Sequence, residues 1–195
     1  MAKEVLFVSI LLIIILEIFG FSLSIRDKGI KIFAYYTQIS NLITLISAVI
    51  MLFYLLNGMI PAWVKQMRYL SSCLLLITAL VTVFILVPMG APPRIVLFSG
   101  KGLFHHTLVP IVSITSYLYL EPHIKSKEAI YDPLIITFIY SAVMIPLNIL
   151  RKFDGPYPFL KVHKQSVLAS ILWIAAMFAL VTALSWVVYT LSIIM

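Results

Sequence analysis

The run from Ile32 to Val64 contains no charged residue, and it is long enough to cross a lipid bilayer as a helix. Its first third is nevertheless polar, because Thr37, Ser40 and Asn41 follow the i, i+3, i+4 spacing that places side chains on one helix face. Two hydroxyls and an amide are costly to expose to lipid. This face is therefore expected to point inward, toward other helices or a hydrated cavity.

The composition of the whole chain agrees with this run. Of the 195 residues, 63% are hydrophobic and 11% are charged, and the mean hydropathy is +1.12. Soluble domains carry about 25% charged residues, so the composition predicts an integral, multi-pass membrane protein. The net charge of +7 comes from basic residues scattered over short connections. That distribution is typical of membrane topology and headgroup contact, and it does not indicate nucleic-acid binding.

Six apolar stretches predict an all-α fold, a bundle of six transmembrane helices forming a single domain over residues 1–195. The expected spans are 5–24, 32–56, 69–87, the stretch between Lys101 and Glu121, 133–150 and 165–195. The apolar piece 95–98 in the connection before the fourth span is too short to cross the membrane and is expected at its interface. No oligomeric state is predicted.

An even number of spans places both termini on one side, with connections 1–2, 3–4 and 5–6 on the other. Thr37, His105, His106 and Asn148 all lie beside these three connections, and Glu17 lies in the nearer half of the first span. The sequence therefore predicts a polar pocket that opens toward these connections, with a dry half of the bundle beneath it.

The distribution of basic residues predicts the orientation of this pocket. Connections 1–2, 3–4 and 5–6 carry nine of the 14 Lys and Arg residues, and the opposite side carries the remaining five. The positive-inside rule then favours a cytoplasmic pocket with both termini outside.

The adjacent histidines at the start of the fourth span suggest chemistry. A helix N-terminus disfavours the protonated imidazole, and a neutral imidazole is what a general base requires. A hydroxyl beside an imidazole is the basic unit of covalent acyl transfer, so Thr37 or Ser40 is expected as nucleophile and His106 or His105 as base. The alternative is an interfacial histidine pair that bonds carbonyls and headgroups. Adjacent histidines do not share a helix face as metal ligands do, so neither a metal site nor a cofactor is predicted.

Further polar residues are candidates for supporting or substrate-binding roles. Asn41 or Asn148 would donate to an oxyanion. Glu17 either pairs with a nearby basic residue or supports a histidine. Tyr157, held between two prolines, is expected over the pocket entry. Arg151, near Asn148 on the pocket side of the fifth span, is the candidate for holding a substrate carboxylate.

Four motifs, taken in their order along the chain, resemble those of one family. Residues 36–42 resemble the Tyr/Phe-Thr-x-x-Ser-Asn-Leu element of bacterial six-span membrane proteins related to the androgen-induced and androgen-dependent TFPI-regulating proteins of animals. Residues 67–70 before the third span, the His-x-x-x-Pro pattern of 106–110, and the Tyr-Pro-Phe-Leu of 157–160 are similar to further motifs of that family. Together the motifs extend over nearly the whole chain.

The animal members hydrolyse fatty acid esters of hydroxy fatty acids (FAHFAs) with a threonine in the second span and a histidine in the fourth. The resemblance implies Thr37 as nucleophile and His106 as base, with His105 one position away as the alternative. The animal proteins lack the Ser-Asn pair, so it assigns no role to Ser40 and Asn41. The expected function is hydrolysis of a membrane lipid ester in a bacterial cell membrane. The alternative is a non-enzymatic lipid-binding or transport protein.

Overall fold

The computed structural model describes residues 2–153 and 156–195, and every element within these ranges is helical. The first three spans are α1 (Ala2–Lys28), α2 (Tyr36–Leu56) and α3 (Ala62–Val81), which continues as the π-helical turn η2 (Thr82–Leu86). The fourth consists of α5 (Gly100–Leu103), the π-helical turn η3 (Phe104–Leu108) and α6 (Val109–Leu120), and it is followed by α7 (Asp132–Ile149) and α8 (Val167–Ile194). Six helical segments in the described ranges are long and apolar enough to cross a membrane, which confirms the predicted six-helix, multi-pass fold.

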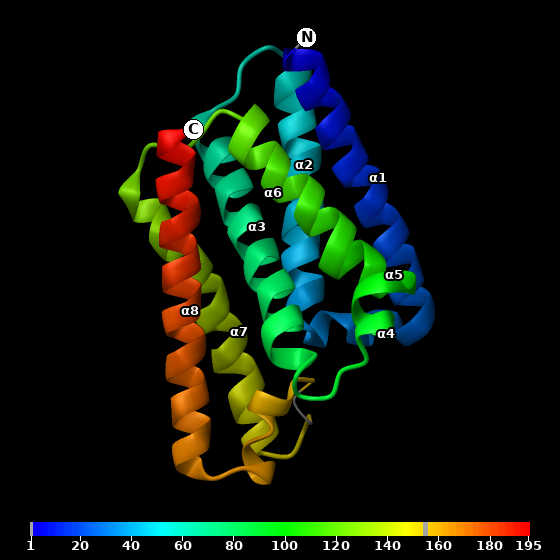
Figure 1. The fold of residues 1–195 in the computed structure, drawn as a ribbon, viewed down its shortest axis with the longest axis vertical. Helices are drawn as coiled ribbons and strands as arrows, with labels where there is room; N and C mark the ends of the chain where they lie inside the picture. The colour runs from blue at the N-terminus through cyan, green and yellow to red at the C-terminus, as the bar shows by residue number, and fades with distance from the viewer. Residues whose placement is uncertain (1, 154–155) are drawn as a thin grey trace.

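Short helices build the connections between the spans. At one end of the bundle lie η1 (Gly29–Ala34), α4 (Pro93–Phe98), η5 (Pro158–Leu160) and η6 (Val162–Lys164), and η4 (Lys127–Tyr131) precedes α7. Both chain ends lie at the opposite end of the bundle from the connections that follow α1, α3 and α7 (Figure 1). This arrangement agrees with the alternation expected of six spans, and α4 is too short to cross the membrane, as predicted.

Local sequence explains where α2 begins and ends. Gly29 adopts a φ of 56°, in the left-handed region that favours glycine, and this permits the turn from α1 into η1. Tyr35 is extended, with φ −96° and ψ 128°, and separates η1 from α2. After Asn57 the chain leaves the helix at Gly58, whose φ of 79° is typical of a helix C-terminus. The polar residues of 36–42 therefore occupy the first turns of α2.

The helix α3 lies at the centre of the bundle. It contacts α2, α6, α7 and α8, whereas α1 packs on α2 and α6 at the far edge (Figure 1). The helix α8 is the most peripheral span, with only 6% of its most apolar window buried inside the protein. Most of the surface of α8 is therefore available to lipid.

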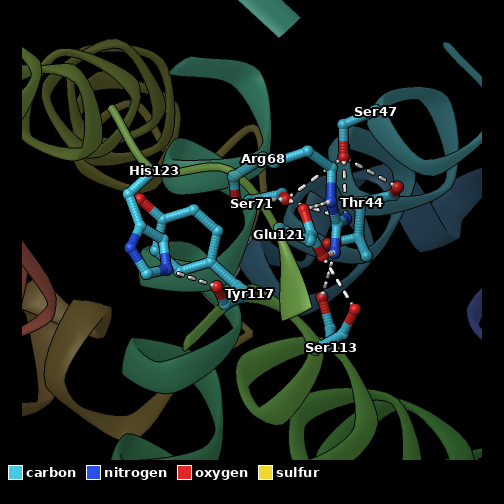
Figure 2. Close-up of polar contacts among 9 residues, drawn as sticks. Thr44, Ser47, Arg68, Ser71, Ser113, Tyr117, Glu121 and His123 are labelled. Atoms are coloured by element: carbon cyan, nitrogen blue, oxygen red, sulfur yellow. Dashed lines mark hydrogen bonds and ion pairs between the residues drawn. The ribbon is translucent and has the colours of Figure 1, made fainter. Parts of the chain in front are cut away.

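The half of the bundle nearest the termini is not purely apolar, which differs from the dry half that the sequence predicts. Arg68 and Glu121 are buried there as an ion pair with two parallel hydrogen bonds, in which Nε and Nη2 of the arginine each donate over 2.8 Å. Figure 2 shows the pair surrounded by serines of α2, α3 and α6. The remaining guanidinium donors bond the hydroxyls of Ser47, Ser71 and Ser113, at 3.2, 3.4 and 3.2 Å respectively.

This network explains why two charges are tolerated inside an apolar bundle. Each N–H of the Arg68 guanidinium has an acceptor, and Ser116 donates a further hydrogen bond of 2.9 Å to Glu121. A buried ion pair is tolerated when its remaining hydrogen-bonding groups are satisfied. The network joins α2, α3 and α6. It therefore holds together three helices whose other ends lie near the connections that follow α1, α3 and α7.

Candidate active site

A cavity of about 680 Å³ lies at the end of the bundle where the three connections meet. Its walls come from the end of α1, the start of α2, the segment from Leu86 through α4 and α5, the turn η3, and residues 156–158. Thr37, His105, His106 and Tyr157 all line this cavity. The structure thus brings together the predicted nucleophile, both candidate bases and the predicted entry residue, although they are far apart in sequence.

Thr37 lies in the first turn of α2 and is buried, with 6% of its surface exposed. Its hydroxyl Oγ1 lies 3.3 Å from the Tyr157 hydroxyl oxygen, within hydrogen-bonding distance. Its backbone N–H donates to the same oxygen over 3.2 Å. The first N–H groups of a helix have no partner within the helix, and Tyr157 supplies one here. In the described part of the chain, neither histidine hydrogen-bonds the Thr37 hydroxyl.

Tyr157 is held rigidly although it belongs to the connection between α7 and α8. Its ring stacks on Phe159, with centroids 5.3 Å apart and planes 6° apart, and meets the edge of Tyr35 at 6.3 Å. Burial raises the pKa of the Tyr157 phenol above its ordinary value of 10. The phenol therefore keeps its proton at physiological pH and remains a hydrogen-bond donor.

The hydrogen bonds of His106 determine which of its nitrogens is available. Nδ1 lies 2.8 Å from the Thr82 hydroxyl, and that hydroxyl donates its single hydrogen to the Thr78 carbonyl over 2.8 Å. Thr82 can then only accept from the imidazole, so we assign the His106 proton to Nδ1. In the neutral ring Nε2 then carries the lone pair, and Nε2 has no hydrogen-bond partner among the described residues. A neutral imidazole with an unpartnered nitrogen, on a residue that lines the cavity, is what a general base requires.

His105 differs from His106 because both of its nitrogens face buried side chains. Gln38 Nε2 lies 3.0 Å from Nδ1, and Glu17 Oε2 lies 3.6 Å from Nε2. The ring also lies so close to Gly20 of α1 that a Cβ there would collide with Nε2. His105 therefore connects α1, α2 and η3, and the geometry favours His106 over His105 as the base. Glu17 lies beside His105, but among the described residues neither of its carboxylate oxygens has a hydrogen-bond partner, so its support of the histidine stays a prediction.

A second, largely apolar cleft adjoins this cavity. It is narrow, about 60 Å³, and runs between α3, α7 and α8 past Ile77, Met177 and Val181. Thr37, Leu86 and Tyr157 line both spaces. Thr37 therefore lies at the boundary between the apolar cleft and the larger cavity, whose lining includes Asp27, Lys28 and Lys101.

Four of the predicted substrate-binding residues do not line either space. Ser40 donates to the Tyr36 carbonyl over 2.9 Å and accepts from Thr78, and Asn41 donates to the Thr37 carbonyl over 2.7 Å. Both side chains face neighbouring helices or their own backbone, so they support the first turns of α2. They are buried, as predicted, but not in contact with the cavity.

Asn148 and Arg151 also differ from expectation. Asn148 accepts the Val162 N–H over 3.0 Å and donates to the Phe153 carbonyl over 3.2 Å, so it fastens the connection between α7 and α8. Arg151 is exposed, because α7 ends at Ile149 and the chain turns away through a φ of 54° at Arg151. It does not lie on the pocket side of the fifth span, and its predicted carboxylate contact has no support.

Sequence reasoning missed two residues that organise the site. Thr82 sets the proton position on His106, and Gln38 orients His105. The only sequence signals were the i, i+4 spacing of Thr78 and Thr82 and the position of Gln38 beside Thr37.

The motifs that resemble the androgen-induced protein family lie at both ends of the bundle. Thr37, His106 and Tyr157 belong to three of these motifs and share one cavity, whereas Arg68 belongs to the fourth and lies in the opposite half. No family model, curated protein or solved structure gave a significant match to the chain, so the resemblance rests on these motifs alone.

Proposed function

We propose that this protein is an intramembrane lipid-ester hydrolase in which Thr37 is the nucleophile and His106 the general base. One observation carries the proposal: Thr37 lies where the apolar cleft adjoins the larger cavity, and His106, whose Nδ1 contacts Thr82, lines the same cavity. This arrangement suits a substrate that is part hydrocarbon and part polar. The motif resemblance extends the proposal to FAHFA-like substrates and to a bacterial cell membrane.

The reaction follows from the proton positions. The Thr37 hydroxyl adds to the ester carbonyl carbon while its proton passes to His106 Nε2, and the carbonyl π electrons move to the oxygen. When the intermediate collapses, the bond to the alcohol oxygen breaks and His106 returns the proton to the departing alcohol. Water then attacks the acyl-Thr37 ester with His106 again as base, which releases the fatty acid and restores Thr37.

The two spaces allow a defined placement of the substrate. The acyl chain lies in the cleft between α3, α7 and α8. Because this cleft is narrow in the resting structure, its side chains move apart to accommodate the chain. The alcohol part occupies the larger cavity, whose rim carries Lys28, bonded to Tyr35, and Lys101, paired with Asp27. Peripheral α8 forms one wall of the cleft, so a lipid has a route from the bilayer.

Hydrolysis by purified protein tests the proposal. Thr37→Ala and His106→Ala each lower kcat/KM for a long-chain ester by about a thousandfold or more, and the double variant is little worse, because the two groups act as one unit. Ser40→Ala is the matched control, since this hydroxyl lies one turn along α2 and outside the cavity. Substantial loss in Ser40→Ala alone would move the nucleophile to that residue.

A lipid-binding or transport protein is the second candidate. The observation that favours it is the Thr37 hydroxyl, which bonds Tyr157 and neither histidine in the resting structure. Saturable binding of a labelled ester without turnover, unchanged in His106→Ala, supports this alternative over hydrolysis.

The distribution of Lys and Arg supports a cavity that faces the cytoplasm. A cysteine introduced as Ser99→Cys, on a Cys73→Ser background, reports this orientation. Ser99 lines the cavity in the connection before α5, so an impermeant thiol reagent labels it only after the cells are opened. Labelling in intact cells contradicts the orientation.

A further inference from the structure

We propose that Tyr157 is a third catalytic residue, whose hydroxyl joins the Thr37 backbone N–H in stabilising the oxyanion of the tetrahedral intermediate. The inference rests on the proposed ester hydrolysis and deepens it. It begins from two contacts: one phenol oxygen, from a connection 120 residues along the chain, meets both the N–H and the hydroxyl of Thr37.

These two hydrogen bonds define the surroundings of the nucleophile in the resting state. The phenol oxygen accepts from the Thr37 N–H at 3.2 Å, and either hydroxyl can donate over the 3.3 Å between it and Thr37 Oγ1; we take the phenol as the donor, because this leaves the Thr37 hydrogen for the base. The Thr37 hydroxyl then accepts from Tyr157, and its hydrogen is directed elsewhere. The cavity shared with His106 is the space that receives it.

The same two donors suit the charge that develops in the reaction. As Thr37 Oγ1 bonds the carbonyl carbon, the electron pair of the carbonyl moves to its oxygen, which lies next to Oγ1 and within reach of groups that surround it. The Thr37 N–H exchanges the phenol oxygen for the oxyanion, and the phenol O–H turns from Oγ1 to the same oxyanion. Two donors that are already in place are the usual composition of an oxyanion hole.

Preorganisation is the property that makes such a site effective, and Tyr157 has it. The ring is buried between Phe159 and Tyr35, and Pro158 opens the short helix η5 directly after it. A phenylalanine would supply the same stacking. The hydroxyl is the feature that stacking does not explain, and its hydrogen bonds go to Thr37, the proposed nucleophile.

The decisive variant is Tyr157→Phe, which retains the stacked ring and removes one donor. Loss of one oxyanion donor costs about 10²–10³-fold in kcat, and we expect that loss with little change in KM. The loss is equal for alkyl esters and for nitrophenyl esters, because both form the same oxyanion. Tyr69→Phe is the control, since this buried tyrosine hydroxyl bonds the Ser185 carbonyl and does not line the cavity.

Three results overturn the inference. An unchanged or raised kcat in Tyr157→Phe makes Tyr157 a cover over Thr37. A loss confined to alkyl esters, whose alcohols leave poorly, assigns the phenol proton to the leaving group. Activity that Thr37→Ala abolishes but Tyr157→Phe lowers by less than about tenfold removes only this inference, whereas a wild-type protein that hydrolyses no ester removes the proposed function itself.

A second measurement applies even if Tyr157→Phe does not fold. Site-specific fluorotyrosine at position 157 keeps the shape of the side chain and makes the phenol more acidic. Because the phenolate cannot donate a hydrogen bond, the alkaline limb of kcat moves to lower pH in the fluorinated protein. An alkaline limb at the same pH in both proteins contradicts a role for the Tyr157 proton.

Discussion

Replacement of Arg68 by methionine tests the buried network that holds α2, α3 and α6 together. The guanidinium gives two hydrogen bonds to Glu121 and three to serine hydroxyls, and both charged side chains are almost fully buried. In Arg68→Met, Glu121 keeps the hydrogen bond from Ser116 but loses its counter-charge. A carboxylate without a counter-charge is then left inside an apolar bundle.

The expected cost follows from what remains buried. Removing one partner of a buried ion pair costs about 3–5 kcal/mol, largely the penalty of the unpaired charge, which corresponds to roughly a hundredfold to a few thousandfold in the unfolding equilibrium. Replacing both partners, with Arg68→Met and Glu121→Gln together, removes that penalty. The double variant is therefore less destabilised than the sum of the single variants by about 2 kcal/mol or more.

Unfolding of the purified protein by SDS in mixed micelles, followed by tryptophan fluorescence, measures these differences. Each single variant shifts the midpoint to much lower SDS, and the double variant recovers part of the shift. Single variants within about 1 kcal/mol of wild type, or costs that simply add, would show that the network does not stabilise the bundle as a coupled unit.

Three further predictions concern the half of the bundle that contains the cavity. Gly20→Val places a side chain against the His105 ring and destabilises the protein by about 1–3 kcal/mol in the same SDS titration, whereas an unchanged midpoint contradicts the close approach. Thr82→Val removes the acceptor that fixes the proton of His106, the proposed base, and it lowers kcat about tenfold, or ~1.4 kcal/mol; equal kcat would mean that another group sets that proton. Asn148→Ala frees the connection 150–166 by removing its hydrogen bonds, so limited proteolysis cuts there faster than in wild type, and an unaltered cleavage rate refutes its fastening role.

The gathering of polar residues at one end was predictable because it depends only on the number of spans. Alternation of six helices places the start of the second and fourth spans beside the same connections, so Thr37 and the two histidines had to lie at one depth. Their convergence on one cavity also needs an inward rotation of each helix. The polar face of α2 supplied that signal, since its hydroxyls and amide avoid lipid.

The pairing of side chains was not predictable in this way. Arg68 looked like a residue of the connection before the third span, but α3 begins at Ala62, and this places the guanidinium more than a turn inside the bundle. Arg151 shows the opposite error, because α7 ends before it and the backbone turns the side chain outward. A shift of a few residues in a helix boundary thus decides whether a charge is buried or exposed.

The most direct test of Thr37 as the nucleophile is the position of a covalent adduct. Purified protein is treated with a long-chain fluorophosphonate, which traps activated hydroxyls, and the tryptic peptide 32–65 is fragmented in a mass spectrometer. We expect a single phosphonyl group on Thr37, formed much more slowly in His106→Ala. An adduct on Ser40, or hydrolytic activity that survives with peptide 32–65 unmodified, contradicts it.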